Sequence, residues 1–428
     1  MKTGTMGSGR FGRFAVVLGA LSLGLLATGC GEECVDQFDC VRERGTPAEG
    51  KRYVCEANRC VVRDLADAGT GGTDAGSDAG TDAGTDAGVA CADLPHDPKL
   101  GTLQLQTGYA ATESVALPDG IGAVTAVQGG SEFKLYGLHG ADNSLYNLGT
   151  WPTIASSTTP LQAVIPEDDR GSSTFPGGYL TNDGTRLLTG YTMAGAGFPG
   201  KVLVYDSATP GNTVYLSAPG NYTAVGVSGG FLINGTGLEG VAEGGAAVYA
   251  LKTDARPFSG FKLATFPVAN PASGYTALAS NNVAVLGYSD TDQGYANFLR
   301  AVAPATYTPA FSGGTTLALS DANAPSIYAS SEHPEASLAE IDGFGEGVAI
   351  RRSVYDSSFN EFTHDVSRIS LTVGGITPGT VTAGDFSPVL TTSNRCTSVV
   401  LMAPMGADLL VGVKDKNGRR IVRLQLPQ

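Results

Sequence analysis

One strand-and-turn unit recurs six times after residue 91, and this repeat constrains the fold more than any other feature of the chain. Each unit has an apolar strand, a turn rich in Gly, Asn or Asp, a second apolar strand, a loop and a third strand, which is a hairpin signal. The units read SVAL-PDG-IGAVTAV with EFKLYGL, GGYLT-NDG-TRLLTGYT with KVLVYDS, YTAVGV-SGG-FLING with AAVYALK, YTALAS-NN-VAVLGYS with NFLRAVA, SLAEI-DGFGE-GVAIRR with HDVSRISLTV, and SVVLMAP-MGA-DLLVGV with RRIVRLQL. Units one to four add a fourth strand: SLYNLG, NTVYLSA, GFKLATF and TTLAL.

Four-stranded antiparallel units repeated every ~45–65 residues predict an all-β protein, a six-bladed β-propeller spanning residues 91–428. The sixth unit has no fourth strand, and residues 100–106 (LGTLQLQ) precede the first unit without belonging to it. We therefore predict that residues 100–106 supply the outer strand of blade six, which closes the ring and hides its edges. A seven-bladed ring and a pair of β-sandwich domains are the alternatives. The low share of charged residues, 16%, and the 60 glycines favour a β protein rich in turns.

The N-terminal residues have the pattern of a secretory signal. Lys2, Arg10 and Arg13 precede an uncharged apolar run at residues 14–27. This run is shorter than the ~20 residues that a membrane span needs, but it suits the apolar core of a signal peptide.

The end of this signal, Ala27-Thr28-Gly29-Cys30, resembles a bacterial lipobox, with Ala27 where Leu is usual. The resemblance implies that residues 1–29 are removed and that Cys30 is acylated. Two or more acyl chains give stable membrane anchoring. Gly31, in place of the Asp that marks inner-membrane retention, implies an outer membrane lipoprotein, either periplasmic or surface-exposed. An ordinary cleaved signal with Cys30 in a disulfide is the alternative.

The chain has seven cysteines, so six remain if Cys30 carries lipid, an even number that suits an oxidising compartment. Four of them form a small module at residues 30–63 with the spacing C-x5-C-x14-C-x4-C: Cys34, Cys40, Cys55 and Cys60. So short a segment needs covalent staples, and it has no His for a zinc site, so we predict two disulfides with the pairing left open. Cys91 and Cys396 flank the proposed seam of the ring, and we predict that they form a disulfide.

Residues 64–90 consist almost entirely of Asp, Ala, Gly and Thr, with the tandem repeat TDAG-SDAG-TDAG-TDAG. This composition offers almost nothing to bury and predicts a disordered linker. A calcium-binding Gly/Asp solenoid is the alternative, but the repeats lack its apolar core positions. A lipidated cysteine, a small cysteine module and an Asp-Ala-Gly linker together resemble myxobacterial cell-envelope lipoproteins over the first 90 residues.

Strand direction in a propeller sorts the connections onto two faces. Connections between second and third strands share one face with those between blades, here called the long-loop face; the other connections form the short-turn face. We place the short turns Asp119-Gly120, Asp183-Gly184 and Asn281-Asn282 on the short-turn face. The long segments on the long-loop face are 151–177, 193–200, 237–245, 289–296, 321–335 and 355–361.

Long loops on a rigid scaffold commonly carry binding residues. Aromatic and acidic side chains on the long-loop face would suit sugars, cations or protein partners, although packing and solvation roles are the plainer interpretation of each. The candidate binding residues are Trp151, Asp168, Asp169, Phe175, Phe198, Glu239, Tyr295, Tyr355 and Phe359.

Motifs for metal, cofactor or nucleotide chemistry are weak. Asp290 and Asp292 resemble half of a Ca²⁺ loop, without the third acidic ligand and the bidentate Glu. The four His are scattered, and neither G-x-S-x-G nor a P-loop occurs, so no cofactor is expected. The net charge of −14 argues against nucleic acid as a partner.

The sequence therefore predicts a membrane-anchored envelope lipoprotein that acts as a non-enzymatic binding or scaffold protein for protein or polysaccharide. The alternative is a carbohydrate-active hydrolase that uses carboxylates on the long-loop face. A hydrolase requires two carboxyl groups that converge within ~5–10 Å, which a scaffold does not. A tethered structural protein is a third interpretation.

Overall fold

The structure is a computed structural model of the chain. It describes residues 51–56, 59–64, 91, 94–140, 144–154, 159–169, 174–176, 178–193, 200–207, 209, 213–218, 222–241, 246–333, 336–356, 361–374, 379–392, 394 and 396–426. The chain divides into two compact units, Met1–Gly88 and Val89–Gln428. No helix in the described part of the chain is long and apolar enough to cross a membrane. The predictions for Cys30, Cys34 and Cys40 and for the linker lie outside the described residues.

In the first unit, β1 (Lys51–Glu56) and β2 (Arg59–Asp64) form an antiparallel hairpin. The aromatic and β-branched residues in YVC and CVV suit such a pair. Cys55 lies opposite Cys60 in the register. Their side chains are outside the described set, so the disulfides of this module stay predictions.

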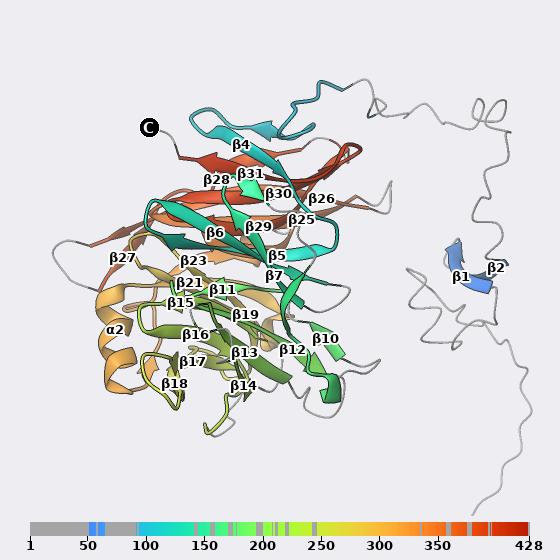
Figure 1. Cartoon of the computed structure of the whole chain (residues 1–428). Helices are drawn as coiled ribbons and strands as arrows, with labels where there is room; N and C mark the ends of the chain where they lie inside the picture. The colour runs from blue at the N-terminus through green and yellow to red at the C-terminus, as the bar shows by residue number, and fades with distance from the viewer. Residues whose placement is uncertain are drawn as a thin grey trace, which may run out of the picture. The chain divides into compact units, whose positions relative to one another are not determined.

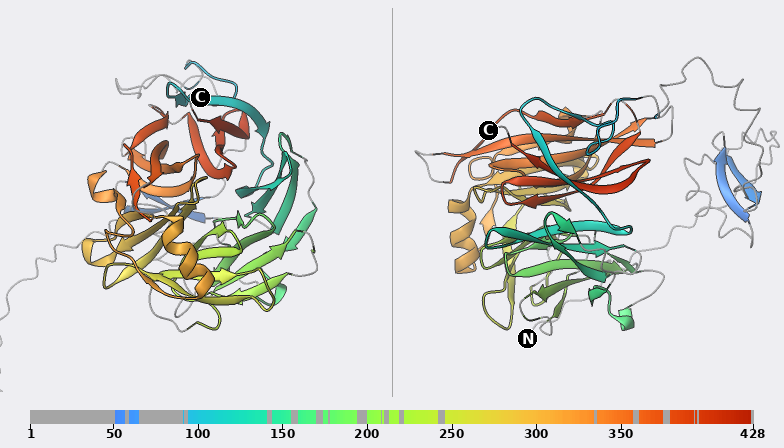
Figure 2. Two further views of the ribbon diagram at one scale, coloured as in Figure 1. Left: turned by 90° about the vertical axis from the view of Figure 1, so that its left-hand side faces the viewer. Right: turned by 45° about the horizontal axis from the view of Figure 1, so that its top comes forward.

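The described part of the second unit contains six mainly antiparallel sheets, which are the blades of a six-bladed propeller (Figures 1 and 2). The repeat thus gave the correct fold class and blade number. Blades one to three consist of β5 (Ile121–Gly129), β6 (Glu132–His139), β7 (Ser144–Thr150), β8 (Thr153–Ile154) and β9 (Pro160–Ala163); β10 (Thr174–Pro176), β11 (Thr181–Asn182), β12 (Arg186–Met193), β13 (Gly200–Asp206) and β14 (Val214–Ser217); and β15 (Thr223–Val227), β16 (Gly230–Gly235), β17 (Ala247–Lys252), β18 (Ser259–Thr265) and β22 (Leu317–Ala318).

The remaining three blades complete the ring, and two of them include strands from the start of the unit. Blades four to six consist of β19 (Pro271–Leu278), β20 (Ala284–Asp290), β21 (Ala296–Val302) and β23 (Ser326–Ala329); β24 (Ser337–Gly343), β25 (Gly347–Asp356), β26 (Glu361–Val373), β27 (Val381–Ala383), β28 (Ser387–Thr391) and β3 (Gln104–Leu105); and β29 (Thr397–Met405), β30 (Asp408–Asp415), β31 (Gly418–Gln425) and β4 (Ala110–Ala116).

Six apolar cores lie between neighbouring blades, one at each interface of the ring. Middle strands are therefore apolar on both faces: all six residues of β16 (GFLING) are buried. This explains why the second strands of the repeat read as continuous apolar runs instead of strict alternation.

The ring is closed by β4, not by residues 100–106 as predicted. β4 pairs antiparallel with β31, with Ile421 opposite Val115, and completes blade six. Within the predicted segment, β3 instead pairs with β28 at the outer edge of blade five. Leu100 and Leu103 are buried in the core between blades five and six, which directs β3 to blade five.

This closure shifts the strand assignment in blade one by one place. SVAL belongs to β4 in blade six, and SLYNLG is the third strand of blade one, β7. The turn Asp119-Gly120 therefore connects two blades and lies on the long-loop face, where the Gly120 carbonyl accepts a hydrogen bond from the Gly140 amide at 2.9 Å. Its predicted place on the short-turn face was wrong.

Blade four also departs from the prediction, because a helix interrupts it. α2 (Pro304–Gly313) follows β21, and its Tyr307 and Phe311 enter the core between blades three and four. This packing brings the TTLAL segment to blade three, where β22 pairs in parallel with β18, and leaves β23 as the fourth strand of blade four. The part of segment 321–335 that precedes β23 thus belongs to the connection between the third and fourth strands of blade four, not to the long-loop face as predicted. α2 lies on the short-turn face, which is toward the reader in the left view of Figure 2.

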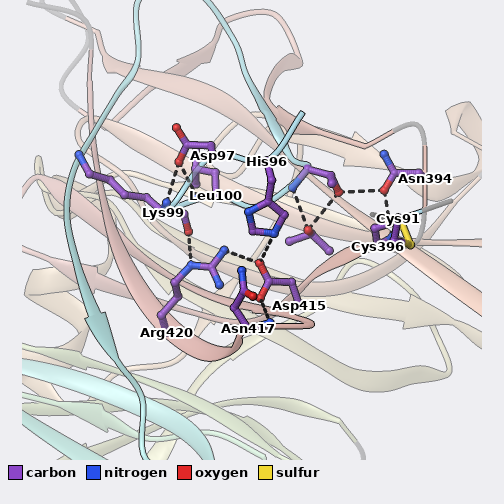
Figure 3. Close-up of polar contacts among 12 residues, drawn as sticks. Cys91, His96, Asp97, Lys99, Leu100, Asn394, Cys396, Asp415, Asn417 and Arg420 are labelled. Atoms are coloured by element: carbon purple, nitrogen blue, oxygen red, sulfur yellow. Dashed lines mark hydrogen bonds and ion pairs between the residues drawn. A yellow bond between two sulfur atoms is a disulfide. The ribbon is translucent and has the colours of Figure 1, made fainter. Parts of the chain in front are cut away.

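The predicted Cys91–Cys396 disulfide is present and joins residues 305 positions apart (Figure 3). Around it, the Thr102 amide donates to Thr397 Oγ1 at 2.8 Å, and Asp97 Oδ1 accepts from the Leu100 amide at 2.8 Å. These contacts hold the segment before β3 against the start of β29.

Deeper in the seam, Asp415 lies between His96, whose Nε2 is 2.9 Å from Oδ2, and Arg420, whose Nη2 is 2.8 Å from Oδ2. Burial alone would raise the pKa of Asp415, but hydrogen bonds from Arg420 and the Asn417 amide hold that pKa below its usual value. The closing segment is thus fixed by a covalent bond, an ion-pair cluster and a strand pairing.

We expect the double variant Cys91→Ser/Cys396→Ser to unfold with a free energy about 4–5 kcal/mol below that of the wild type, on the chain-entropy account of a cross-link over so long a loop. Guanidinium unfolding followed by Trp151 fluorescence measures this, because Trp151 is the only Trp and is buried in the ring. Reductant should bring the wild type to the variant's midpoint and leave the variant unchanged. Equal stability of both proteins under oxidising conditions would contradict the role of the bond.

Candidate functional site

Trp151 does not lie on the long-loop face. It follows β7 at the start of the third-to-fourth connection of blade one, so its predicted place was wrong for the same reason as that of Asp119-Gly120. Its ring is 8% exposed in the core between blades six and one, and its Nε1 donates to Glu113 Oε2 at 2.7 Å. This hydrogen bond, with the nearby Arg423, lowers the pKa of Glu113. Trp151 therefore packs the closing strand and is not part of a binding surface.

The acidic candidates on the long-loop face are spread over three blades, and several have structural partners. Asp169, in η2 (Glu167–Asp169), lies 2.6 Å from Lys201 Nζ and accepts a hydrogen bond from Tyr191, and both contacts lower its pKa. Glu239 accepts from the Ser217 amide at 2.8 Å. Asp168 is exposed beside Asp169.

The Asp290–Tyr295 turn is a capped 3-10 turn, η3 (Thr291–Gln293). Asp290 is 4% exposed, and its carboxyl accepts from the Asp292 amide at 3.0 Å and from Gln293 Nε2 at 2.8 Å. The Asx-type cap accounts for the DTDQG pattern. No group of three His, Cys, Asp or Glu side chains able to hold a metal ion occurs among the described residues.

Tyr295 is the most exposed large hydrophobic residue in the described part of the chain. It is 67% exposed at a backbone φ of 64° and follows the turn that Asp290 caps. A large residue in the left-handed region carries a conformational cost, and such sites are enriched at functional positions. Phe175 and Tyr355 belong to β10 and β25, but their side chains are outside the described set, as are the whole of Phe198 and Phe359.

The first strands of all six blades line a central cavity of about 730 Å³. Many polar groups on its wall connect neighbouring blades. Asn182 Nδ2 donates to Thr125 Oγ1 at 2.7 Å, Tyr222 Oη donates to the Tyr191 carbonyl at 2.9 Å, and Tyr275 Oη donates to the Leu338 carbonyl at 2.8 Å. The cavity wall is thus held in place by hydrogen bonds between blades.

Blade five places two acids on this wall, Glu340 and Asp342, both on β24. Arg351 on β25 donates from Nε to Glu340 Oε2 at 2.8 Å and from Nη1 to the Val399 carbonyl of blade six at 3.4 Å. This pair therefore connects blades five and six, and Glu340 has its own counter-ion.

Asp342 has no such partner. No hydrogen bond or ion pair to its carboxyl occurs among the described residues. Burial and the like charge of Glu340 raise the pKa of Asp342 well above its usual value, against the opposing effect of Arg351. The carboxyl that faces the cavity therefore ionises less readily than that of a solvent-exposed Asp.

This pair was missed in the sequence, although a signal is present. β24 reads SLAEIDG, whereas β5, β11, β15, β19 and β29 contain no charged residue. Leu338 and Ile341 of β24 pack into the core between blades four and five, and a bulge between Leu338 and Glu340 resets the alternation. Glu340 and Asp342 consequently lie on the side of β24 that faces the cavity.

Comparison with known proteins adds little to this site. No family model and no curated protein matches the chain. Among solved structures the chain is similar to BamB from Moraxella catarrhalis, with 9% sequence identity and a TM-score of 0.28 over 74% of this chain and 98% of that chain. At a TM-score this low, the similarity carries no conclusion about function.

Replacing Asp342 with Asn should raise the free energy of unfolding at pH 7. The unfolded chain ionises this carboxyl near its usual pKa of 3.8, whereas the fold raises that pKa, so the wild type loses stability as the pH rises from 3.8 towards the folded pKa. The gain of Asp342→Asn should therefore shrink as the pH falls towards 4.

Guanidinium unfolding between pH 4 and 8 measures this difference, and Asp254→Asn, at an exposed acid, is the matched control. A variant less stable than the wild type at pH 7 would mean that Asp342 is ionised and paired, against the expectation.

Proposed function

We propose that this protein is an outer membrane lipoprotein, anchored through Cys30, that binds protein or polysaccharide on the long-loop face of its propeller without catalysis. The observation that carries this proposal is the closed ring, which directs the connections between blades and between second and third strands to one face. A rigid scaffold with connections gathered on one side is a common basis for binding.

Tyr295 is the natural anchor of such a surface. Its ring is exposed, while its backbone is fixed by a hydrogen bond from the Tyr295 amide to the Asp290 carbonyl at 2.9 Å. Aromatic side chains held in place bury much area on binding at little entropic cost. A pre-ordered Tyr next to exposed Asp292 suits a protein or sugar surface.

Two observations support the rest of the proposal. Asp169, Glu239 and Asp290 each make structural contacts, so these three acids of the long-loop face have roles in holding the fold. The Cys91–Cys396 disulfide suits a compartment outside the reducing cytosol, in agreement with a lipoprotein signal.

The test places a photo-crosslinking residue at Tyr295 in the full chain, with Asp254, an exposed residue between β17 and β18 on the short-turn face, as the matched position. We expect adducts with envelope protein, or retention on insoluble envelope polysaccharide that Tyr295→Ala lowers at least tenfold, only for position 295. In the same cells, Cys30→Ser should abolish labelling by an alkyne fatty acid and release the protein from membranes. Equal adducts from both positions, or neither adducts nor retention, would count against the binding face.

A second candidate function rests on Glu340 and Asp342. Two neighbouring carboxyl groups in a cavity, both with a raised pKa and one of them paired with Arg351, resemble the acid pair that glycoside hydrolases use, so the hydrolase alternative moves from the long-loop face to β24. If it holds, the wild type should cleave a glycan from a panel of envelope polysaccharides, and Asp342→Asn and Glu340→Gln should each lower kcat/KM by about 100-fold or more. An inactive wild type across the panel would remove this candidate.

A further inference from the structure

The charges that line the central cavity do not balance. The cavity holds three carboxyl groups, from Asp183, Glu340 and Asp342, and one guanidinium, from Arg351. Arg351 donates hydrogen bonds to Glu340 and to the Val399 carbonyl. Asp183 accepts from Thr253 Oγ1 at 2.9 Å and from the Arg186 amide at 2.7 Å. Of these three acids, Asp342 alone faces the cavity without a partner among the described residues.

The uncharged polar side chains of the cavity wall also bear on which ligand would fit. Tyr222 and Tyr275 donate their hydroxyl protons to backbone carbonyls, and Thr223 Oγ1 donates to the Gly274 carbonyl at 2.8 Å. These groups have their protons committed to the ring, and what they retain towards the cavity is oxygen lone pairs. At these three positions the wall therefore offers hydrogen-bond acceptors and no free donor.

A ligand for such a cavity should bring hydrogen-bond donors and positive charge. An anion would meet the Asp342 carboxyl and a guanidinium already paired with Glu340. A volume of about 730 Å³ lies within the range of small-molecule sites. We propose that the central cavity binds a small aliphatic amine, whose ammonium group pairs with the Asp342 carboxylate.

This pairing has a chemical consequence. Burial and the charge of Glu340 raise the pKa of Asp342, whereas a paired ammonium favours the carboxylate, so binding displaces a proton into solvent from any carboxyl that is still protonated. The charged groups around Asp342 are Glu340 on its own strand, Arg351 on β25 and Asp183 across the cavity; among the cavity-lining residues, β29 contributes Met402 and Pro404, which do not titrate. Binding should therefore release up to one proton for each amine bound.

Isothermal titration of the purified full chain tests the proposal with methylamine, putrescine, agmatine and spermidine, and with 1,4-butanediol as the uncharged counterpart of putrescine. We expect at least one amine to bind with proton release, seen as a heat that changes between two buffers of different ionisation enthalpy. Asp342→Asn should weaken that binding at least tenfold, whereas Asp254→Asn should leave it unchanged.

Three results would overturn the proposal: no binding of any amine, equal binding of 1,4-butanediol, or an Asp342→Asn variant that binds as the wild type does. Thermal unfolding of each variant checks that the ring is intact, and Asp342→Ser provides a second substitution at the site. The inference concerns the cavity, so it can fail while the long-loop face and Cys30 behave as proposed, and the reverse also holds.

Discussion

The pairing of β4 with β31 is the constraint on which the rest of the ring depends. Each of the six apolar cores lies between two blades, so every blade needs a neighbour on both sides. Without β4, blade six would lose its outer strand, and the hydrogen bond between Trp151 and Glu113 that joins it to blade one would go as well. The central cavity exists only because the ring is closed, and its wall is held by bonds between adjacent blades.

Much of the fold could be predicted from the sequence, because hairpin turns and apolar runs are local features. The number of units and the Cys91–Cys396 bond were recovered from spacing and parity. The partner of each strand was not, since PDG at residues 118–120 reads as a hairpin turn whether its two strands pair or belong to different blades. The prediction for TTLAL failed for a related reason: α2 takes the chain to blade three through Tyr307 and Phe311, whose i, i+4 spacing covers a single turn and does not indicate which blade the helix contacts.

The candidate site was harder to predict, because the assembled ring determines how exposed a side chain is and in which direction it points. Trp151 and Tyr295 look alike as isolated aromatics next to turns, yet one is 8% exposed and the other 67%. Glu340 and Asp342 are ordinary acids of a strand until it is known that β24 lines the centre and that a bulge sets their direction. Their environment, an unbalanced charge inside a rigid wall, arises from six strands that are far apart in sequence.

The position of the disulfide also determines how the ring responds to force. A pull along residues 64–90 reaches the propeller at Cys91, which is bonded to Cys396 at the start of the innermost strand of blade six. Without that bond, the load would pass into β3 and β4, which lie at the outer edges of their sheets and would peel off one hydrogen bond at a time. With it, the load bypasses both edge strands and acts on β29, which is anchored between blades. A pull on the chain before Cys91 would thus leave the closing strand out of the path of tension.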